Sequence, residues 1–430
     1  MLKYFKIENS YSYSKPTTLN FEADFAKKDL WQFVRETHGS HFLPVAALYG
    51  SNAGGKSNLC RAVEDFIVNI LTRHDSFYGN RPTPFLLAGR RSSYIQHEAC
   101  FSFTDASGNI LEYEYGYSFK DKPFNISRES MKIRIPGRAE HAGFVREGAE
   151  IEFNGSYAND NRNLLISVAK DTGTLLVNAL GPANIRYGIS EIFNWCRRAE
   201  CIISVPGDIE MNYDSVRLAQ NVAAYSDYRE RLSTFVTRFD SSVAHVGAAL
   251  TSFEESENPW ENDYELVTSH PVRFAEGIKH VGIPYHMLSN GTKKLFHLFE
   301  SVSRCLDGGG FLVIDELDTM LHPVIFRKIV QTFNDPKTNR NNAQLAFAAH
   351  NTIVLNREDL RRDQIVIVDK DEAGRSSIKR LSEMTDEFGR PIRSDLRYDK
   401  VYLTGILGSF PYDFDKVTFN GDGDRENAHA

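Results

Sequence analysis

Cysteine is scarce in this chain, and long apolar runs are missing. The cysteines are odd in number and form no C-x-x-C pair, which argues against a disulfide framework and against a zinc site. No run of 18 apolar residues occurs, and residues 1–7 alternate like a strand, without the apolar core of a signal peptide. We therefore expect a cytoplasmic protein with no membrane partner. The cysteines are Cys60, Cys100, Cys196, Cys201 and Cys305.

A strong excess of charge and a regular repeat are missing as well. The net charge is −7 and the pI is near 6.0, so composition does not point to nucleic acid, although a local basic groove stays open. Sustained heptads do not occur, which excludes long coiled-coil arms. The hydrophobic fraction of 41% is typical of a folded protein. The 430 residues predict two lobes, or one α/β core with a sizeable insertion.

A phosphate-binding loop is the strongest motif in the chain. It follows the apolar run 44–49 and precedes residues 57–72, which have helical spacing, and this strand–loop–helix context supports the motif. Backbone N–H groups and the helix N-terminus would hold phosphates, with Lys56 on the β and γ phosphates and Ser57 on Mg²⁺. We predict ATP and Mg²⁺ as cofactors. The predicted nucleotide-binding residues here are Gly50, Ser51, Asn52, Ala53, Gly54, Gly55, Lys56, Ser57 and Asn58.

Two carboxylates close an apolar run further along the chain. Residues 311–314 read as a buried parallel strand, and Asp315 and Glu316 follow directly. Asp315 is predicted to hold Mg²⁺ through water, and Glu316 to orient or deprotonate the attacking water. Alone, such a strand end is often only structural. Together with the phosphate-binding loop it predicts ATP hydrolysis.

A third motif, Leu288-Ser289-Asn290-Gly291, begins a predicted helix over 291–306. Taken alone it is more often an ordinary capped helix. It resembles the L-S-x-G signature of ABC-type ATPases. That resemblance implies that Ser289 and Gly291 contact the γ phosphate of a nucleotide held by the opposite subunit, as the exposed N–H groups of a helix start could do.

Two further positions match the same family in order. Leu317-Asp318 resembles its D-loop, and His350 resembles its switch histidine, which contacts the γ phosphate. The predicted catalytic residues are thus Glu316, His350 and Lys56. A convincing Q-loop is lacking, because Gln96 is only a weak candidate.

The resemblance implies an α/β fold: an ABC-type P-loop core, in which helices flank a mixed sheet, with an inserted, mainly helical lid. We predict helices over 185–198, 215–239 and 323–333, and strands over 97–103, 112–119, 344–349 and 364–368. The predicted divisions are an N-terminal lobe 1–119, the inserted lid 120–265, a C-terminal lobe 266–415 and a flexible tail 416–430.

Several segments are similar to stand-alone ATPases of the RecF, SMC and OLD-like class. A transporter engine is disfavoured, since about 230 residues separate Ser57 from Ser289. The resemblance implies a sensor ATPase in an anti-phage defence operon, like those of PARIS, Septu and abortive-infection systems, beside a separately encoded nuclease or toxin. A metal site at Asp369-Lys370-Asp371 is rejected in favour of a hairpin turn. The segments are 1–21, 311–323, 348–352, 365–371 and 402–405.

Our leading hypothesis is an ATP-hydrolysing switch that works as a homodimer, or a larger homo-oligomer, through composite ATP sites and controls a separate effector. The alternative is a RecF-like ATPase that binds DNA in repair or recombination; a kinase would need neither the signature nor the switch histidine. The arginines at 357, 361 and 362 alternate with acids, which predicts a solvated face rather than a DNA contact. His270, His280, His286 and His297 keep no metal-ligand spacing.

Overall fold

The computed structural model supplies the architecture of the chain. It describes residues 1–26, 29–37, 40–72, 83–85, 87, 94–104, 108–120, 125–134, 142–203, 212–251, 256, 258, 260, 262–385, 389 and 397–403. The predicted tail 416–430 and residues 404–405 lie outside these ranges.

A six-stranded sheet forms the centre of the molecule. Its strand order is β11-β15-β16-β5-β17-β18, and all neighbours are parallel except the final β17–β18 hairpin. The inner strands are apolar and almost fully buried, as expected for a parallel sheet covered on both faces. The strands are β5 (Val45–Gly50), β11 (Ala199–Ile202), β15 (Phe311–Ile314), β16 (Gln344–Ala348), β17 (Ile365–Lys370) and β18 (Ser376–Arg380).

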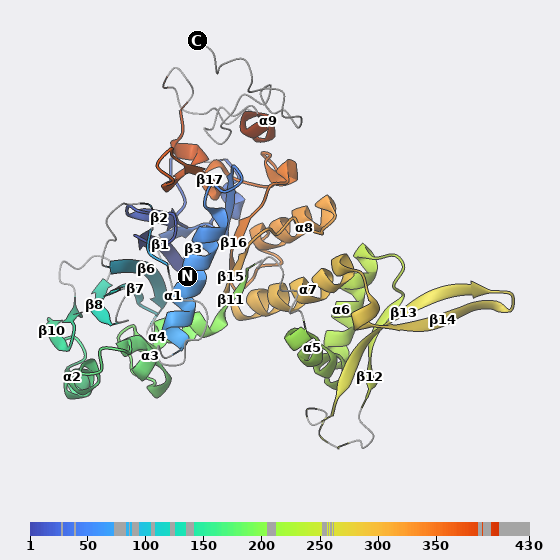
Figure 1. Cartoon of the computed structure of the whole chain (residues 1–430), viewed down its shortest axis with the longest axis horizontal. Coiled ribbons are helices and arrows are strands. Elements are labelled where there is room, and N and C mark those ends of the chain that lie inside the picture. Colours follow the sequence, from blue (N-terminus) through green and yellow to red (C-terminus); the bar gives the residue numbers. More distant parts are fainter. Residues whose placement is uncertain are drawn as a thin grey trace, which may run out of the picture.

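Helix α1 (Lys56–Leu71) covers one face of this sheet and separates it from a second, antiparallel one (Figure 1). The core there joins Leu48 and Val313 of the first sheet, Phe66 of α1, and aromatic residues of the second. The second sheet has the order β10-β9-β8-β7-β6-β1-β2. Its strands are β1 (Leu2–Glu8), β2 (Thr17–Asn20), β6 (Tyr94–Thr104), β7 (Ile110–Lys120), β8 (Ile126–Arg134), β9 (Ala142–Glu147) and β10 (Glu150–Asn154).

Three helices cover the opposite face of the central sheet. Alternation along each strand explains why: Ala46 and Leu48 face α1, whereas Val45 and Ala47 face this second helical layer. The helices are α7 (Asn290–Gly308), α8 (Pro323–Asn334) and α9 (Tyr398–Leu403). Helices α2 (Arg162–Ala169), α3 (Leu176–Leu180) and α4 (Ile189–Arg198) and the small hairpin β3 (Arg35–Thr37) and β4 (Ser40–Phe42) complete the core.

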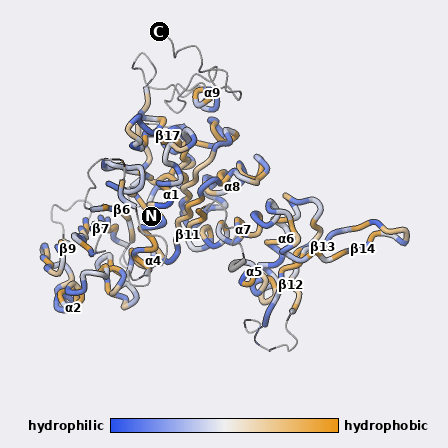
Figure 2. Tube along the Cα trace, viewed as in Figure 1, coloured by the Kyte–Doolittle hydropathy of each residue, from blue (hydrophilic) through white to orange (hydrophobic). Residues whose placement is uncertain are grey.

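A separate unit stands beside the core and has its own small hydrophobic cluster. It contains α5 (Asn212–Ala224), α6 (Ser226–Phe239) and the antiparallel strands β12 (His245–Leu250), β13 (Tyr264–Phe274) and β14 (Gly277–Pro284). Phe296 and Phe299 of α7 pack into the same cluster, so α7 runs from this unit into the core. The outer half of the β13–β14 ribbon projects away from the molecule and bears hydrophobic residues (Figures 1 and 2).

The structure divides the segment 120–265, for which one lid is expected, among three places. Strands β8–β10 extend the antiparallel sheet, and β11 joins the central sheet beside β15. Only the part from α5 onward belongs to the separate unit. From Glu129 onward the burial of β8 alternates, with Glu129, Met131 and Ile133 buried, as expected for a strand with one face on the core.

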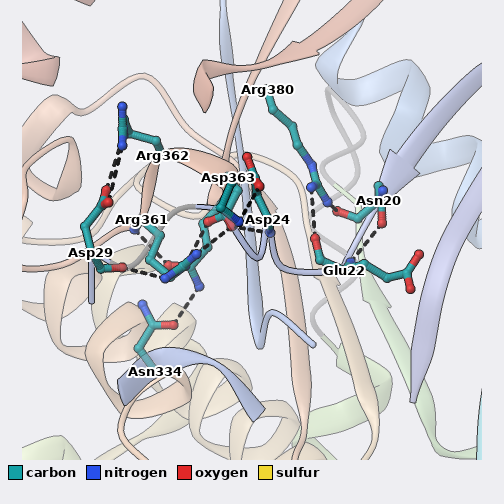
Figure 3. A network of polar contacts seen from close by, with 11 residues as sticks. Asn20, Glu22, Asp24, Asp29, Asn334, Arg361, Arg362, Asp363 and Arg380 are labelled. Carbon is teal, nitrogen blue, oxygen red and sulfur yellow. Dashed lines mark hydrogen bonds and ion pairs between the residues drawn. The ribbon is translucent and has the colours of Figure 1, made fainter. Parts of the chain in front are cut away.

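The prediction of a solvated face at residues 357–363 holds for Arg357 and Glu358, which are exposed, but is wrong for Arg361 and Arg362, which are buried. Arg361 and Asp363 are each 1% exposed and form a bidentate pair with N–O distances of 2.9 and 2.8 Å. The backbone N–H of Asp24 donates to Asp363, and Arg362 pairs with Asp29 (Figure 3). A pattern of alternating charges cannot reveal this network, because its partners come from a segment more than 300 residues away.

Candidate functional site

The phosphate-binding loop, residues 50–57, links β5 to α1 and needs its glycines for space. A Cβ atom on Gly50 would lie 1.9 Å from the carbonyl oxygen of Val368. Gly55 has a φ of +121°, and a Cβ there would lie 2.3 Å from Ser376 Oγ. These approaches leave no room for a side chain, so the loop can pack directly against the β17–β18 hairpin.

Hydrogen bonds from three other segments hold the loop in place. Ser376 Oγ donates to the Gly54 carbonyl at 2.6 Å, Tyr13 Oη to the Gly55 carbonyl at 3.0 Å, and Tyr402 Oη to the Gly50 carbonyl at 3.0 Å. Each of these bonds joins the loop backbone to a segment outside the loop. The loop is therefore preorganised before any ligand binds.

Lys56 lies inside the loop and is buried. Its Nζ donates to the carbonyls of Gly50 and Ser51, both at 2.9 Å. Burial, the largest cause, lowers the pKa of Lys56, while Asp315 opposes that shift. The lysine is a cation held at the base of a glycine loop, which suits an anionic ligand.

Asp315 and Glu316 follow β15, beside the loop. Burial raises the pKa of Asp315, and its hydrogen bond with Ser57 acts in the opposite direction. Its buried Oδ1 has no hydrogen-bond partner among the described residues. An unpartnered carboxylate oxygen beside a serine hydroxyl fits Mg²⁺, which prefers oxygen ligands. Ser57 and Asp315 would hold the ion, which supplies charge neutralisation for the phosphates when it is bound.

Glu316 adopts a left-handed backbone conformation with a φ of +51°. Lys294 Nζ of α7 donates to its carbonyl at 3.0 Å and to the carbonyl of Thr319 at 2.6 Å. The Thr319 hydroxyl donates to Glu316 Oε2 at 3.2 Å. The turn after β15 is thus held by α7, the helix that begins at the signature motif.

Asp318 and His350 are connected through the backbone. Asp318 Oδ2 accepts from the N–H groups of His350 and Asn351 at 2.9 and 2.6 Å. Burial, then the charge of Lys56, lowers the pKa of His350, so its imidazole is neutral at pH 7. Asp318 therefore fixes the segment that carries His350.

The central residues of these motifs line one cavity of about 360 Å³. Of the predicted residues, Gly50, Ser51 and Asp318 support this cavity from outside its lining, and Ser289 and Gly291 lie elsewhere. Lys370, at the end of β17, also lines the cavity. No local motif marks it, because its place depends on the pairing of β17 with β5. The predicted residues in the lining are Asn52, Ala53, Gly54, Gly55, Lys56, Ser57, Asn58, Asp315, Glu316 and His350.

The signature segment begins α7 as a capped helix. Ser289 Oγ accepts from the Thr292 N–H at 3.1 Å, and the Thr292 hydroxyl donates to Asp240 at 2.7 Å. Ser289 is exposed, and neither it nor Gly291 lines the cavity of its own chain. The helix start is therefore open to a partner.

Gln96 lies within β6, where it pairs with Ser118 and Glu8, and does not line the cavity. Its assignment as a Q-loop residue stays a prediction. Strand β11 ends beside Ile314, and the chain then enters residues 204–211, outside the described part.

Comparison with known proteins places the chain in a family. Residues 45–356 match the AAA_21 family, described as "AAA domain, putative AbiEii toxin, Type IV TA system". The chain belongs to this family. As a member of AAA_21 it is a nucleotide-binding P-loop protein of the ATPase type, in agreement with the resemblance to stand-alone ABC/SMC-like ATPases and with the predicted α/β class.

Two solved structures are also similar to this AAA_21 protein. One is an SMC head bound to the C-winged helix domain of ScpA, at 14% identity, covering 88% of this chain and 96% of that chain with a TM-score of 0.46. The other is the SMC head domain from Thermotoga maritima, at 14% identity, covering 88% and 98% with a TM-score of 0.38. No curated protein matches the sequence.

The described residues hold neither a membrane-spanning helix nor a cluster of metal ligands. Among the described residues, no helix combines the length and apolar character needed to cross a membrane. Within the same residues, no group of three or more His, Cys, Asp and Glu side chains has an arrangement suited to a metal ion.

Proposed function

We propose that this protein is an ATP-hydrolysing switch whose two nucleotides are each bound between two protomers. Lys56 and Ser57 of one protomer hold the phosphates, and Ser289 and Gly291 of the other cover them. One observation carries the proposal: the cavity collects the P-loop, the Asp315-Glu316 pair and His350 from one chain, while the signature residues stay outside it on an exposed helix start. A helix start favours an anion.

Hydrolysis in this proposal depends on positioning. The Glu316 carboxylate orients or deprotonates the attacking water, and Lys56 offsets charge on the β and γ phosphates. The neutral His350 imidazole donates one hydrogen bond to an oxygen of the γ phosphate. Each of these groups borders the same cavity.

Helix α7 offers a route from nucleotide to the separate unit. Lys294 links α7 to the Glu316 turn, and Thr292 links the same helix to Asp240 at the end of α6. Binding of the partner's nucleotide at Ser289 would shift the start of α7 and so change both of these contacts. The unit formed by α5, α6 and β12–β14 is the part that would move relative to the core.

The biological role we propose is control of a separately encoded nuclease or toxin in anti-phage defence. The family description, which names a putative AbiEii toxin and a type IV toxin–antitoxin system, supports the toxin–antitoxin setting of that role. The unit around α5 and α6, with its projecting ribbon, is the part that would hold or release the effector.

DNA binding as in RecF is the second candidate, and one feature favours it. Arg273 and Lys279 are exposed on the β13–β14 ribbon, and cations on a thin ribbon suit phosphates. ATP-dependent DNA affinity that falls steeply with salt would favour this candidate over the effector role.

Mixing two inactive variants tests the composite site. Lys56→Ala removes the phosphate contact, and Gly291→Asp places a negative charge at the helix start. If the sites are shared between protomers, a mixture in equal amounts regains about a quarter of wild-type hydrolysis, because half of the dimers are mixed and each of these has one intact site. Steady-state phosphate release measures the recovery. A mixture as inactive as its components would refute shared sites.

A further inference from the structure

We propose that Lys370 is a nucleotide-binding residue whose ammonium group binds the phosphate chain of ATP. This inference rests on the proposed function, because it concerns the same cavity. Lys370 is the second lysine, with Lys56, in the lining of that cavity. It lies on a different element, the β17–β18 hairpin, more than 300 residues along the chain.

The strand register explains how Lys370 reaches the loop. Strand β17 runs parallel to β5, and Val368 is paired with Gly50, the first residue of the loop. Lys370, two residues further on, therefore lies beside the start of the loop. Side chains two apart in a strand share a face, and Val366 and Val368 pack into the core on the α1 side. Lys370 is thus on the face of the sheet where α1 begins.

The hairpin is fixed to the loop, which fixes the backbone of Lys370. Ser376 is the register partner of Lys370. Its N–H donates to the Ser12 carbonyl at 2.7 Å, and its Oγ donates to the Gly54 carbonyl at 2.6 Å. The backbone of Lys370 is therefore fixed before a ligand binds in the loop. This lowers the conformational entropy lost on binding.

The charge on Lys370 has no partner in the described part of the chain. Its Nζ makes no hydrogen bond or ion pair there, although two aspartates flank it. Asp371 is paired with Arg375 at 2.7 Å, and Asp369 Oδ1 accepts from the Lys370 backbone N–H at 2.9 Å. The ammonium group of Lys370 therefore lines a cavity bordered by the P-loop without being paired to either flanking aspartate. An anionic ligand in the cavity would supply the missing partner.

A solvated lysine is the alternative, since the side chain is partly exposed. The two alternatives differ in what neutralisation of Lys370 does to binding. A phosphate contact adds to ground-state affinity, so its loss raises KM more than it lowers kcat. A solvated lysine changes neither.

The experiment measures Mg–ATP affinity of Lys370→Gln by titration calorimetry. We expect binding about tenfold weaker, the usual effect of losing one charge-assisted hydrogen bond to phosphate, with KM raised and kcat almost unchanged. Lys370→Arg keeps the charge and should bind close to wild type. The control is Lys379→Gln, an exposed lysine on the same hairpin that does not line the cavity. Unchanged affinity in Lys370→Gln, or an equal loss in Lys370→Arg, would overturn the proposal.

Two further probes locate the contact and separate it from the proposed function. Mg–tripolyphosphate, which has neither base nor sugar, should lose affinity for Lys370→Gln by the same factor as ATP. A loss seen only with ATP would place Lys370 at the nucleoside and refute the phosphate contact. Lys56→Ala is titrated in parallel: if it binds ATP normally, the proposed function fails, whereas normal binding by Lys370→Gln alone refutes only this inference.

Discussion

Glu316 has a backbone conformation that is uncommon for a residue with a side chain. Its φ of +51° costs about 1–3 kcal/mol, and such strain is kept where the surroundings impose it. Lys294 and Thr319 supply those surroundings. The carboxylate predicted to act on water is therefore aimed by a strained turn rather than by the strand before it.

Asp65 is a buried carboxylate whose charge should affect the stability of the fold. Burial, the largest cause, raises its pKa from 3.8 to about 7, and its hydrogen bond from Tyr11 acts in the opposite direction. Between pH 4 and pH 7 the folded state holds this proton more tightly than the unfolded state, so stability falls as pH rises through that window. Asp65→Asn keeps an acceptor for Tyr11 and removes the charge.

We expect Asp65→Asn to be more stable than wild type at pH 8, by about 2–4 kcal/mol, and nearly equal to it at pH 4. Urea denaturation at both pH values measures the difference. A variant that is less stable at pH 8, or whose difference from wild type does not change with pH, would contradict this account of Asp65.

Individual residues of the site could be predicted where they belong to a local motif. The glycines, Lys56 and Ser57 lie in one loop, and Asp315, Glu316 and His350 each follow an apolar strand, so short stretches of sequence were sufficient. Lys370 and the Arg361–Asp363 pair could not be found in this way. Their roles depend on strand order and on contacts with Ser12 and Asp24, which are distant in the sequence.

At the scale of elements, α7 connects three parts of the molecule. It begins at the signature segment, packs Phe296 and Phe299 into the separate unit, and buries Leu295 and Leu298 against the central sheet. Lys294, between these layers, is buried enough that its pKa falls to about 8. Burying its ammonium group costs free energy, so we infer that Lys294 has a specific role. That role is to hold the turn at Glu316.

Lys294→Met tests the connection. The variant loses two hydrogen bonds to the carbonyls of Glu316 and Thr319, so the carboxylate is less well aimed. We expect kcat to fall about tenfold or more while ATP affinity is unchanged, since positioning acts on the transition state. Hydrolysis and titration assays separate these quantities. The control, Lys328→Met, alters an exposed lysine on α8; hydrolysis by Lys294→Met at the control's rate would disprove the connection.

The elements themselves were predictable to different degrees. The predicted helices at 57–72, 291–306 and 323–333 agree with α1, α7 and α8 to within a few residues, because each has a clear apolar face. Strands β8–β10 were missed. They are rich in polar residues and are stabilised by pairing in series, β8 with β7, β9 with β8 and β10 with β9. That pairing cannot be read from local sequence.

At the scale of the whole molecule, two sheets enclose α1, and a smaller unit is attached mainly through α7. This arrangement places the cavity on the core and leaves Ser289, at the start of α7, exposed outside it. In the proposed function each protomer would supply the P-loop side of one site and the signature side of another, and a head-to-tail pair of protomers would complete both.

Light scattering with and without Mg–ATP, on the wild type and on Glu316→Gln, tests this central claim most directly. Glu316→Gln should bind ATP but hydrolyse it slowly, so the closed dimer should accumulate. We expect its mass to double when ATP is added, with a smaller or transient shift for the wild type. A mass equal to one protomer under all conditions, with ATP shown to be bound, would contradict the composite site.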